Sequence, residues 1–277
     1  MRAVKNRCAV WVGAAIATTF AIQATAATEA ETHALAKASQ NPVASLISVP
    51  FENNFNGDYG SDNSKQNVLN VKPVIPVQIG ENWNLINRTI IPFISQPGTP
   101  GGPNRQNGLG DTTYQAFISP SKPGNWIWGL GPQVQVPTHT DEVLGNEHWG
   151  AGLAGVVLTM PGKWVVGGLV THMVDVASSG NDGSESDISL TVIQPIVNYN
   201  FGGGWYVSSV PVITANWEAD NDDEWTIPLG GGVGRVFHWG KQPVKMQMAY
   251  YYNVKKPDSG AQWDLQLTFN LLFPKKK

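Results

Sequence analysis

The side chains that could do chemistry in this chain are a few charged residues within segments where apolar and polar residues alternate. The charges assigned to the polar faces of those segments are Glu52, Lys72, Arg88, Asp111, Asp175, Lys245 and Asp264. If the segments cross a membrane, an Arg or Lys facing lipid at mid-depth costs about 2–4 kcal/mol, so we expect these charges to face an enclosed lumen. Two interpretations are equally open. The charges form ion pairs that fill the lumen, or they line a polar path that selects solutes.

Hydrolytic catalysis needs a nucleophile, a base and an orienting group that the fold brings together. The histidines of the chain are His33, His139, His148, His172 and His238, and none lies in an H-E-x-x-H or G-x-S-x-G pattern. His139 with Asp141, Ser178 or Ser179 could act as in a barrel lipase or acyltransferase, although the spacing gives no support. A Ser or Asp within hydrogen-bond reach of one of the histidines would favour that alternative. We predict no catalytic residue, no cofactor site and no metal site.

One stretch is densely acidic and runs Glu218-Ala219-Asp220-Asn221-Asp222-Asp223-Glu224. Its oxygens could ligate Ca²⁺, but the glycine and the spacing of an EF-hand loop are absent. We expect a solvated surface loop, where a divalent cation could bridge the carboxylates to outer-membrane lipid or lipopolysaccharide.

The elements that would position these side chains are strands, and the stretch from Trp263 to Phe273 has the clearest pattern. Successive side chains of an extended chain point to opposite sides. Leu265, Leu267, Phe269, Leu271 and Phe273 share one side, and Asp264, Gln266, Thr268 and Asn270 share the other. In a soluble sandwich the apolar side would meet a core. In an outer-membrane barrel it meets lipid, and the polar side lines the lumen.

The first 26 residues have the pattern of a secretory signal peptide. Arg2, Lys5 and Arg7 precede an uncharged run from Cys8 to Ile22, and Ala24-Thr25-Ala26 provides the small-x-small cleavage pattern. Cleavage removes the only cysteine, so we expect neither disulfides nor thiol chemistry in the mature chain. It also changes the formal charge from −3 to −6, because 15 Lys and Arg then face 21 Asp and Glu, which argues against a nucleic-acid partner.

From Ala44 onward the sequence divides into twelve expected strands, an even number as single-chain outer-membrane barrels require. They are Ser45–Asn56, Gln66–Ile79, Trp83–Ser95, Gly108–Ser119, Asn125–Pro137, His148–Met160, Lys163–Ala177, Ser186–Phe201, Gly204–Trp217, Glu224–Trp239, Pro243–Val254 and Gln262–Phe273. Short connections such as Pro161-Gly162 alternate with long ones such as Thr138–Glu147. That alternation is typical of short periplasmic turns and longer outer loops. The 30 Gly and 19 Pro suit a turn-rich β protein, and prolines inside strands predict bulges.

Tryptophan positions favour the membrane interpretation. All ten tryptophans after the leader lie beside a turn or a loop, and none lies in the middle of an expected strand. Indoles collect where hydrocarbon meets headgroups, so we predict two aromatic girdles. Arg235 falls on the lipid face by strict alternation, so either a bulge turns it inward or it snorkels to the interface.

Residues 27–43 precede the expected barrel. Thr28 and Glu31 form a capping-box pattern, which predicts a short helix that ends before Asn41-Pro42. Leu35 is its one large apolar residue, so the helix has little to bury. We therefore prefer a periplasmic tail over a loose plug.

A series of short motifs follows along the chain after the leader. They are Asn41–Phe51, Asn70–Pro76, Trp83–Thr89, Gly108–Asp111, Gly129–Pro132, Trp149–Gly152, Gln242–Val244 and Leu271–Pro274. In their order and spacing they resemble the outer-membrane β-barrel family named after the meta-pathway of phenol degradation, whose members are often labelled transporter or neuromedin U. The resemblance implies an outer-membrane channel, with aromatic or other small apolar solutes as candidates. The basic tail after Phe273 departs from the terminal aromatic residue that usually signals barrel assembly.

The sequence as a whole predicts a signal peptide at 1–26, a periplasmic N-terminal segment at 27–43 and a barrel at 44–277. The fold class is all-β, a closed antiparallel transmembrane β-barrel of twelve strands. The predicted function is passive diffusion of small solutes through the cell outer membrane, with no cofactor. The alternatives are a filled structural or surface-binding barrel and, less favoured, a barrel hydrolase or acyltransferase.

Overall fold

The computed structural model describes residues 29–60, 63–98, 104–178, 188–220 and 222–274 of the 277-residue chain. The expected signal peptide, residues 1–26, lies outside this part. The elements in chain order are α1 (Glu29–Ala38), β1 (Ile47–Tyr59), β2 (Ser64–Val71), β3 (Val74–Ile79), β4 (Trp83–Gln96), β5 (Gln106–Leu109), β6 (Thr112–Pro120), β7 (Trp126–Val136), the 3₁₀ turn η1 (Glu142–Leu144), β8 (His148–Thr159), β9 (Trp164–Ser178), β10 (Ser189–Asn200), β11 (Trp205–Ser209), β12 (Ile213–Asn216), β13 (Trp225–Trp239), β14 (Gln242–Lys255) and β15 (Trp263–Phe273). No helix within the described ranges is long and apolar enough to cross a membrane.

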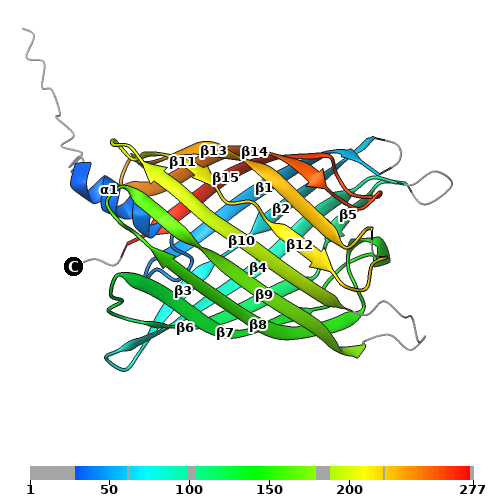
Figure 1. Cartoon of the computed structure of the whole chain (residues 1–277), viewed down its shortest axis with the longest axis horizontal. Helices are drawn as coiled ribbons and strands as arrows, with labels where there is room; N and C mark the ends of the chain where they lie inside the picture. The colour runs from blue at the N-terminus through cyan, green and yellow to red at the C-terminus, as the bar shows by residue number, and fades with distance from the viewer. Residues whose placement is uncertain (1–28, 61–62, 99–103, 179–187, 221, 275–277) are drawn as a thin grey trace, which may run out of the picture.

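The strands form one closed antiparallel barrel (Figure 1). The first strand, β1, pairs with the last, β15, from Ile47 opposite Phe273 to Gly57 opposite Trp263. Three of the twelve barrel strands are split in two, as β2 with β3, β5 with β6, and β11 with β12, so that fifteen segments appear. The expected twelve-stranded barrel is therefore confirmed.

Each split lies at a proline or a glycine. The separating residues are Lys72-Pro73, Gly110-Asp111 and Val210-Pro211-Val212. Proline brings no N–H to the strand ladder, so pairing stops there. A further bulge lies in β13 between Ile227 and Pro228. It is followed by Gly230 at φ +158°, where a Cβ would collide with the Tyr250 carbonyl, so this turn of the strand requires glycine.

The outer wall of the barrel is apolar. On β14, Met246, Met248 and Tyr250 are about half exposed, while Ala249 and Tyr251 are buried. On β15, Leu267 is exposed and Asn270 is buried, as the alternation predicts. The wide band of exposed aliphatic side chains is the surface that a hydrocarbon layer covers in a membrane barrel.

Tryptophans rim this band at both ends. The exposed ones are Trp83, Trp126, Trp128, Trp149, Trp164, Trp205, Trp217 and Trp239. Each lies within three residues of the end of a strand or directly beside that end, as the predicted girdles require. Trp83 packs edge-on against Trp128 at one end, and Trp217 packs edge-on against Trp225 at the other.

The two ends of the barrel differ (Figure 1). Helix α1, the short turns and the C-terminal end of β15 lie at one end, which we call the helix end. The longer connections lie at the opposite end, which we call the loop end. The predicted sorting of short and long connections is thus observed.

The N-terminal segment, residues 29–43, is packed into the helix end and does not hang free as the expected tail. Ala36 is 1% exposed and Val43 is 4% exposed. Ala36 contacts a cluster from the barrel interior that comprises Leu46, Tyr206, Val236 and Leu272. The single large apolar residue of the helix was a poor guide, because small residues bury well where the chain lies against a wall.

Val43 joins a second and larger apolar cluster inside the barrel. Its members are Ile86, Phe117, Ala154, Val156, Leu158, Val165, Leu169 and Ile196, from strands β4, β6, β8, β9 and β10. A Cβ on Gly129 of β7 would lie 2.9 Å from Val43 Cγ1, so the segment reaches across to that wall. The lumen at the helix end therefore contains a packed core, not a uniformly polar lining.

Candidate functional site

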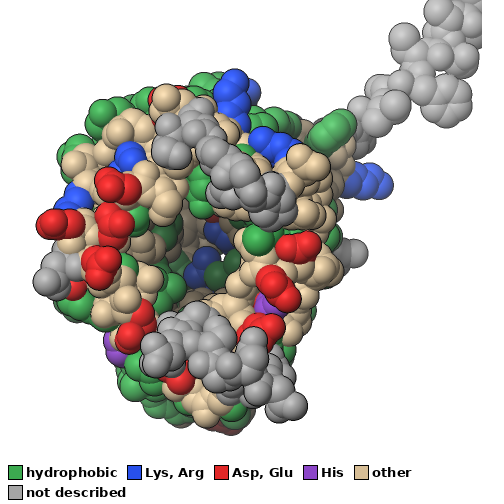
Figure 2. Space-filling view, turned by 90° about the vertical axis from the view of Figure 1, so that its right-hand side faces the viewer, with side chains coloured by type: hydrophobic (Ala, Val, Ile, Leu, Met, Phe, Trp, Pro, Cys, Tyr) green, Lys and Arg blue, Asp and Glu red, His purple; other side chains and the backbone are tan. Residues whose placement is uncertain are grey.

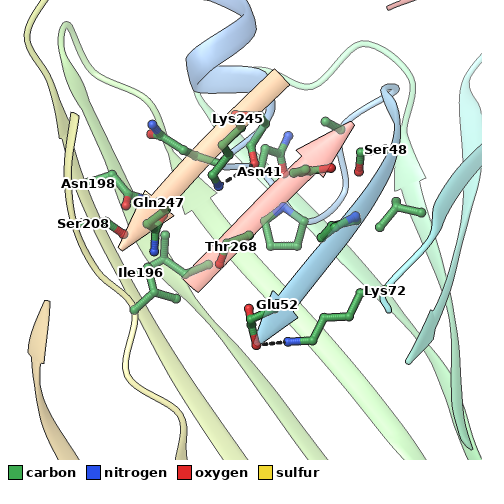
Figure 3. Close-up of a pocket in the computed structure, with 18 of the residues that line it drawn as sticks. Asn41, Ser48, Glu52, Lys72, Ile196, Asn198, Ser208, Lys245, Gln247 and Thr268 are labelled. Atoms are coloured by element: carbon green, nitrogen blue, oxygen red, sulfur yellow. Dashed lines mark hydrogen bonds and ion pairs between the residues drawn. The ribbon is translucent and has the colours of Figure 1, made fainter. Parts of the chain in front are cut away.

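A cavity of about 180 Å³ lies inside the barrel beside the N-terminal segment, and we call it the inner chamber (Figure 3). Residues 38–42 and 44 form one side, and β1, β10, β14 and β15 contribute much of the rest. Its charged lining residues are Glu52, Lys72, Arg88 and Lys245. All four belong to the charges that the sequence assigned to the polar faces of strands.

Glu52 and Lys72 form an ion pair across the wall between β1 and the split that follows β2. Their side chains are 19% and 15% exposed, respectively. The split positions Lys72, whose backbone N–H donates to the Pro50 carbonyl over 2.9 Å. Figure 3 shows the Lys72 amine directed at the Glu52 carboxylate. This pair is therefore a neutral unit within the lining.

Arg88 of β4 has a neutral partner. Its Nη1 lies 3.4 Å from Gln115 Oε1 on β6, and Gln115 in turn donates to Gln133 Oε1 on β7 over 2.9 Å. Both glutamines are buried, at 4% exposure each. This row of amides holds the guanidinium against the wall and leaves its charge uncompensated by a direct carboxylate contact.

Lys245 of β14 also contacts neutral groups. Its Nζ donates to the Ser39 carbonyl over 3.3 Å, and it lies 5.5 Å from the centre of the Tyr206 ring. The Tyr206 hydroxyl donates to Gln247 Oε1 over 3.0 Å. Lys245 therefore connects the barrel wall to the N-terminal segment at the chamber edge.

A second cavity, of about 350 Å³, lies toward the loop end, and we call it the outer chamber. It shares Glu52 and Lys72 with the inner chamber and adds Asp264 of β15. Its other lining groups include Asn54, Asn253 and further polar side chains. The shared ion pair places the two chambers next to each other along the lumen.

Asp111 is placed differently, because it organises the connection between β7 and β8. Its Oδ1 accepts from the backbone N–H groups of Thr138 and His139, at 3.2 and 3.3 Å, and its Oδ2 accepts from the Asn146 N–H at 2.6 Å. Its side chain is 7% exposed and lines neither chamber. Asp175 also lies away from the chambers, with Oδ2 at 3.9 Å from His148 Nδ1.

Asp111 also meets the geometric condition set for the hydrolase alternative, since its Oδ1 lies 2.7 Å from His139 Nδ1. A catalytic pair would need a nucleophile on the other ring nitrogen. Among the residues whose side chains the structure describes, His139 has no serine or threonine partner; the side chains of the candidate nucleophiles Ser178 and Ser179 lie outside that set. The Asp111 carboxylate also accepts from three backbone N–H groups, so its contact with His139 stabilises the connection between β7 and β8.

The acidic stretch at Glu218–Glu224 connects β12 and β13 at the loop end. Asp223 Oδ1 accepts from the Asp258 N–H over 3.1 Å, which links it to the next connection. Among the described residues, which leave out Asn221, no group of three His, Cys, Asp or Glu side chains is arranged to hold a metal ion. A divalent cation at this loop stays a prediction.

Hydrogen bonds tie the N-terminal segment to the wall. Lys37 Nζ donates to the carbonyls of Met160 and Gly162, both over 2.9 Å, in the turn between β8 and β9. Partial burial lowers the pKa of Lys37 from its ordinary value. Gln40 Nε2 donates to Asn200 Oδ1 at the end of β10 over 2.9 Å. These contacts were not predictable from local sequence patterns, because each partner is more than 120 residues away.

Of the two alternatives for Arg235, an inward side chain at a bulge or a side chain directed to the membrane interface, the structure shows the second. It is exposed on the outer face of β13, its Nε donates to the Gly203 carbonyl over 3.3 Å, and its guanidinium lies 5.1 Å from the centre of the Trp205 ring. Gly203 lies in the short turn at the helix end, and Trp205 begins β11 directly after that turn. The charge thus snorkels to the tryptophan rim.

The geometry defines a class: the chain has the fold of an outer-membrane β-barrel channel, with chambers inside it. A family model described as "Putative MetA-pathway of phenol degradation" matches residues 60–175, and the family expected from the sequence is confirmed over that stretch. A search of curated proteins finds no match to this sequence.

One solved structure supports the fold. The COG4313 outer membrane channel from Pseudomonas putida F1 superposes with a TM-score of 0.65 at 19% identity, covering 84% of this chain and 97% of that one. The Salmonella typhi outer membrane phospholipase dimer with bound calcium gives 0.45 at 13% identity, covering 90% and 99%. The toluene transporter TodX of P. putida gives 0.35 at 8% identity, covering 82% and 87%. The last two scores are too low to support any inference about this chain.

Proposed function

We propose that this chain is a passive channel in the cell outer membrane, through which small solutes diffuse without a cofactor. The observation that carries the proposal is the pair of adjoining chambers inside a closed barrel whose outer wall is apolar. A lumen lined by amides, hydroxyls and charges offers water and polar groups a path that the hydrocarbon does not.

The chamber lining favours solutes with an apolar part. Val74, Ile196 and Val210 line the inner chamber together with its charged groups, and they belong to or adjoin the larger apolar cluster. Aromatic or other small apolar molecules would lose less free energy of solvation against this wall than in a uniformly polar lumen. The family match agrees with such solutes and is consistent with a catabolic setting.

A filled structural or surface-binding barrel is the second candidate, and the N-terminal segment is the observation that favours it. The segment occupies the helix end and packs against both apolar clusters. If it never moves, solutes have only the space beside it. Near that end a third cavity, of about 390 Å³, lies between Ser45, Asn84 and Lys122. This cavity shares no lining residue with either chamber.

Single-channel recording in planar bilayers tests the proposal. The full mature chain should show discrete conductance steps, and addition of a small aromatic solute should reduce the ionic current while the solute occupies the lumen. Liposomes that contain the protein should take up the same solute faster than empty liposomes. Absence of both conductance and uptake would leave the filled barrel as the better account.

A further inference from the structure

The inner chamber contains more positive than negative charge. Of its described lining residues, Lys72, Arg88 and Lys245 are basic and Glu52 alone is acidic. Glu52 is paired with Lys72, and the nearest polar partners of the other two cations are neutral oxygens. The next carboxylate along the lumen, Asp264, lines the outer chamber instead.

A single carboxylate therefore faces three cations across a space that the barrel encloses. Charges in such a low-dielectric space interact more strongly than in bulk water. An anion that entered would meet Arg88, whose planar fork of N–H donors matches a carboxylate, and Lys245, which acts as a second point charge. Neither cation would have to give up an ion pair to receive it.

The same chamber has an apolar side. Val74 of β3, Ile196 of β10 and Val210 line it together with Leu46. Its volume is about 180 Å³. An engineered apolar cavity of about 150 Å³ in another protein binds benzene, so this space can hold one ring with a small substituent.

We propose that the inner chamber is a binding site for a small organic anion, with one carboxylate attached to an apolar body the size of a single ring. The carboxylate lies between Arg88 and Lys245, and the body lies against Val74 and Ile196. This inference rests on the proposed channel function, because the anion reaches the chamber through the lumen. It adds a charge preference to the solute class.

The rim of the barrel makes this preference testable. Figure 2 looks into the loop end and shows acidic side chains around the opening, with basic side chains deep inside. The acidic loop residues would favour cations at the entrance. A preference for anions would therefore have to arise at the chamber, and removal of chamber cations should abolish it.

The first test is binding of benzoate to the full mature chain in detergent, measured by isothermal titration calorimetry. Benzamide has the same ring and no charge, and acetate has the charge and no ring. Benzoate should bind, with both relatives weaker by about tenfold or more, since a charged hydrogen bond contributes about 1.5–3 kcal/mol. Equal binding of benzoate and benzamide, or no binding of benzoate, would overturn the proposal.

Variants then locate the site. Arg88→Gln and Lys245→Gln should each weaken benzoate binding by about tenfold while benzamide is unaffected. Lys241→Gln removes a charge from the exposed turn between β13 and β14 and should change nothing. Lys245 also contacts the N-terminal segment, whereas Arg88 does not, so Arg88→Gln separates loss of charge from movement of the segment. Unchanged benzoate binding in Arg88→Gln, with the barrel intact, contradicts the proposal.

Reversal potentials in a KCl gradient separate this inference from the channel proposal. Preference for chloride in the native chain, reduced in Arg88→Gln and Lys245→Gln, supports both. Conductance without anion preference, together with no benzoate binding, would sink the anion site and leave the channel. Benzoate binding without any conductance would support the anion site and contradict the channel.

Discussion

The helix end and the loop end of this barrel are stabilised by different means. At the helix end, residues 29–43 fill the lumen and bury Ala36 and Val43 within two apolar clusters. At the loop end, the connections are held by polar contacts such as those of Asp111, and acidic side chains surround the opening (Figure 2). The helix end therefore has the packing of a soluble core, whereas the loop end resembles a hydrated surface.

The difference implies that the two ends affect solute passage in different ways. The packed segment narrows the helix end of the lumen. It stays in place because its removal would expose apolar side chains such as Ile86 and Leu158 to water. The hydrated rim at the loop end hardly restricts solutes by size, and it acts on them through its charge. Most of the resistance to solute flow should then lie at the helix end. The local stability of the long connections should depend only on contacts at the loop end.

The strongest test of this comparison is deletion of residues 29–42. The expected result is a several-fold increase in single-channel conductance, because the lumen loses the segment that fills it. Cation–anion preference should weaken as well, since the chamber loses one of its sides. Conductance equal to that of the full chain, in a barrel that keeps its β circular dichroism and heat-modifiable migration, would refute the assignment of the resistance to this segment.

Val43→Asp should have the next largest effect. A carboxylate in the apolar cluster would lack a partner, and burying it costs several kcal/mol, so the segment should leave its place. Conductance should then approach that of the deletion. Val43→Ala is the matched control: it removes methyl groups at a cost of about 1–3 kcal/mol and should keep the segment and the native conductance. Equal conductance in the two variants would contradict the idea.

Much of the wall was predictable from the sequence, and the reason is physical. Lipid admits almost no charge, so the outward positions of strands such as β14 and β15 must be apolar and their alternation is easily recognised. Inward positions carry no such rule. Leu158 and Val165 face inward and are fully buried, yet alternation alone assigns the inward face of a barrel to polar groups. Whether an inward-facing residue is polar or apolar depends on what fills the lumen beside it.

The candidate site shows the same limit. Glu52, Arg88 and Lys245 lie within strands, where alternation fixes their direction. Lys72 lies in the split after β2, but its backbone N–H still donates to Pro50 of β1, and the structure brings all four around one chamber. Asp111 lies in a split next to Gly110, where strand geometry ends, and its carboxylate turns to a loop instead. No local pattern could have paired Gln40 with Asn200, which are 160 residues apart.

Asp111→Ala addresses the loop end. Loss of the acceptor for three backbone N–H groups and for His139 should cost about 1.5–3 kcal/mol of local stability. Amide hydrogen exchange over residues 138–146 should accelerate by about tenfold or more, while conductance stays close to native. Glu142→Ala, at an exposed carboxylate of the same connection, is the control and should leave exchange unchanged. A large change in conductance would show that the two ends are coupled.

The smallest expected effect concerns Arg235, which lies at the helix end but on the outside of the barrel. Its cation–π contact with Trp205 is worth about 0.5–1 kcal/mol, so Arg235→Ala should lower the free energy of unfolding by that order. Arg235→Lys keeps the charge and should lose less. Urea titration of the protein in lipid vesicles measures both. If the helix end is stabilised mainly from within, Val43→Ala should cost more than Arg235→Ala, and the opposite order would assign its stability to the membrane rim.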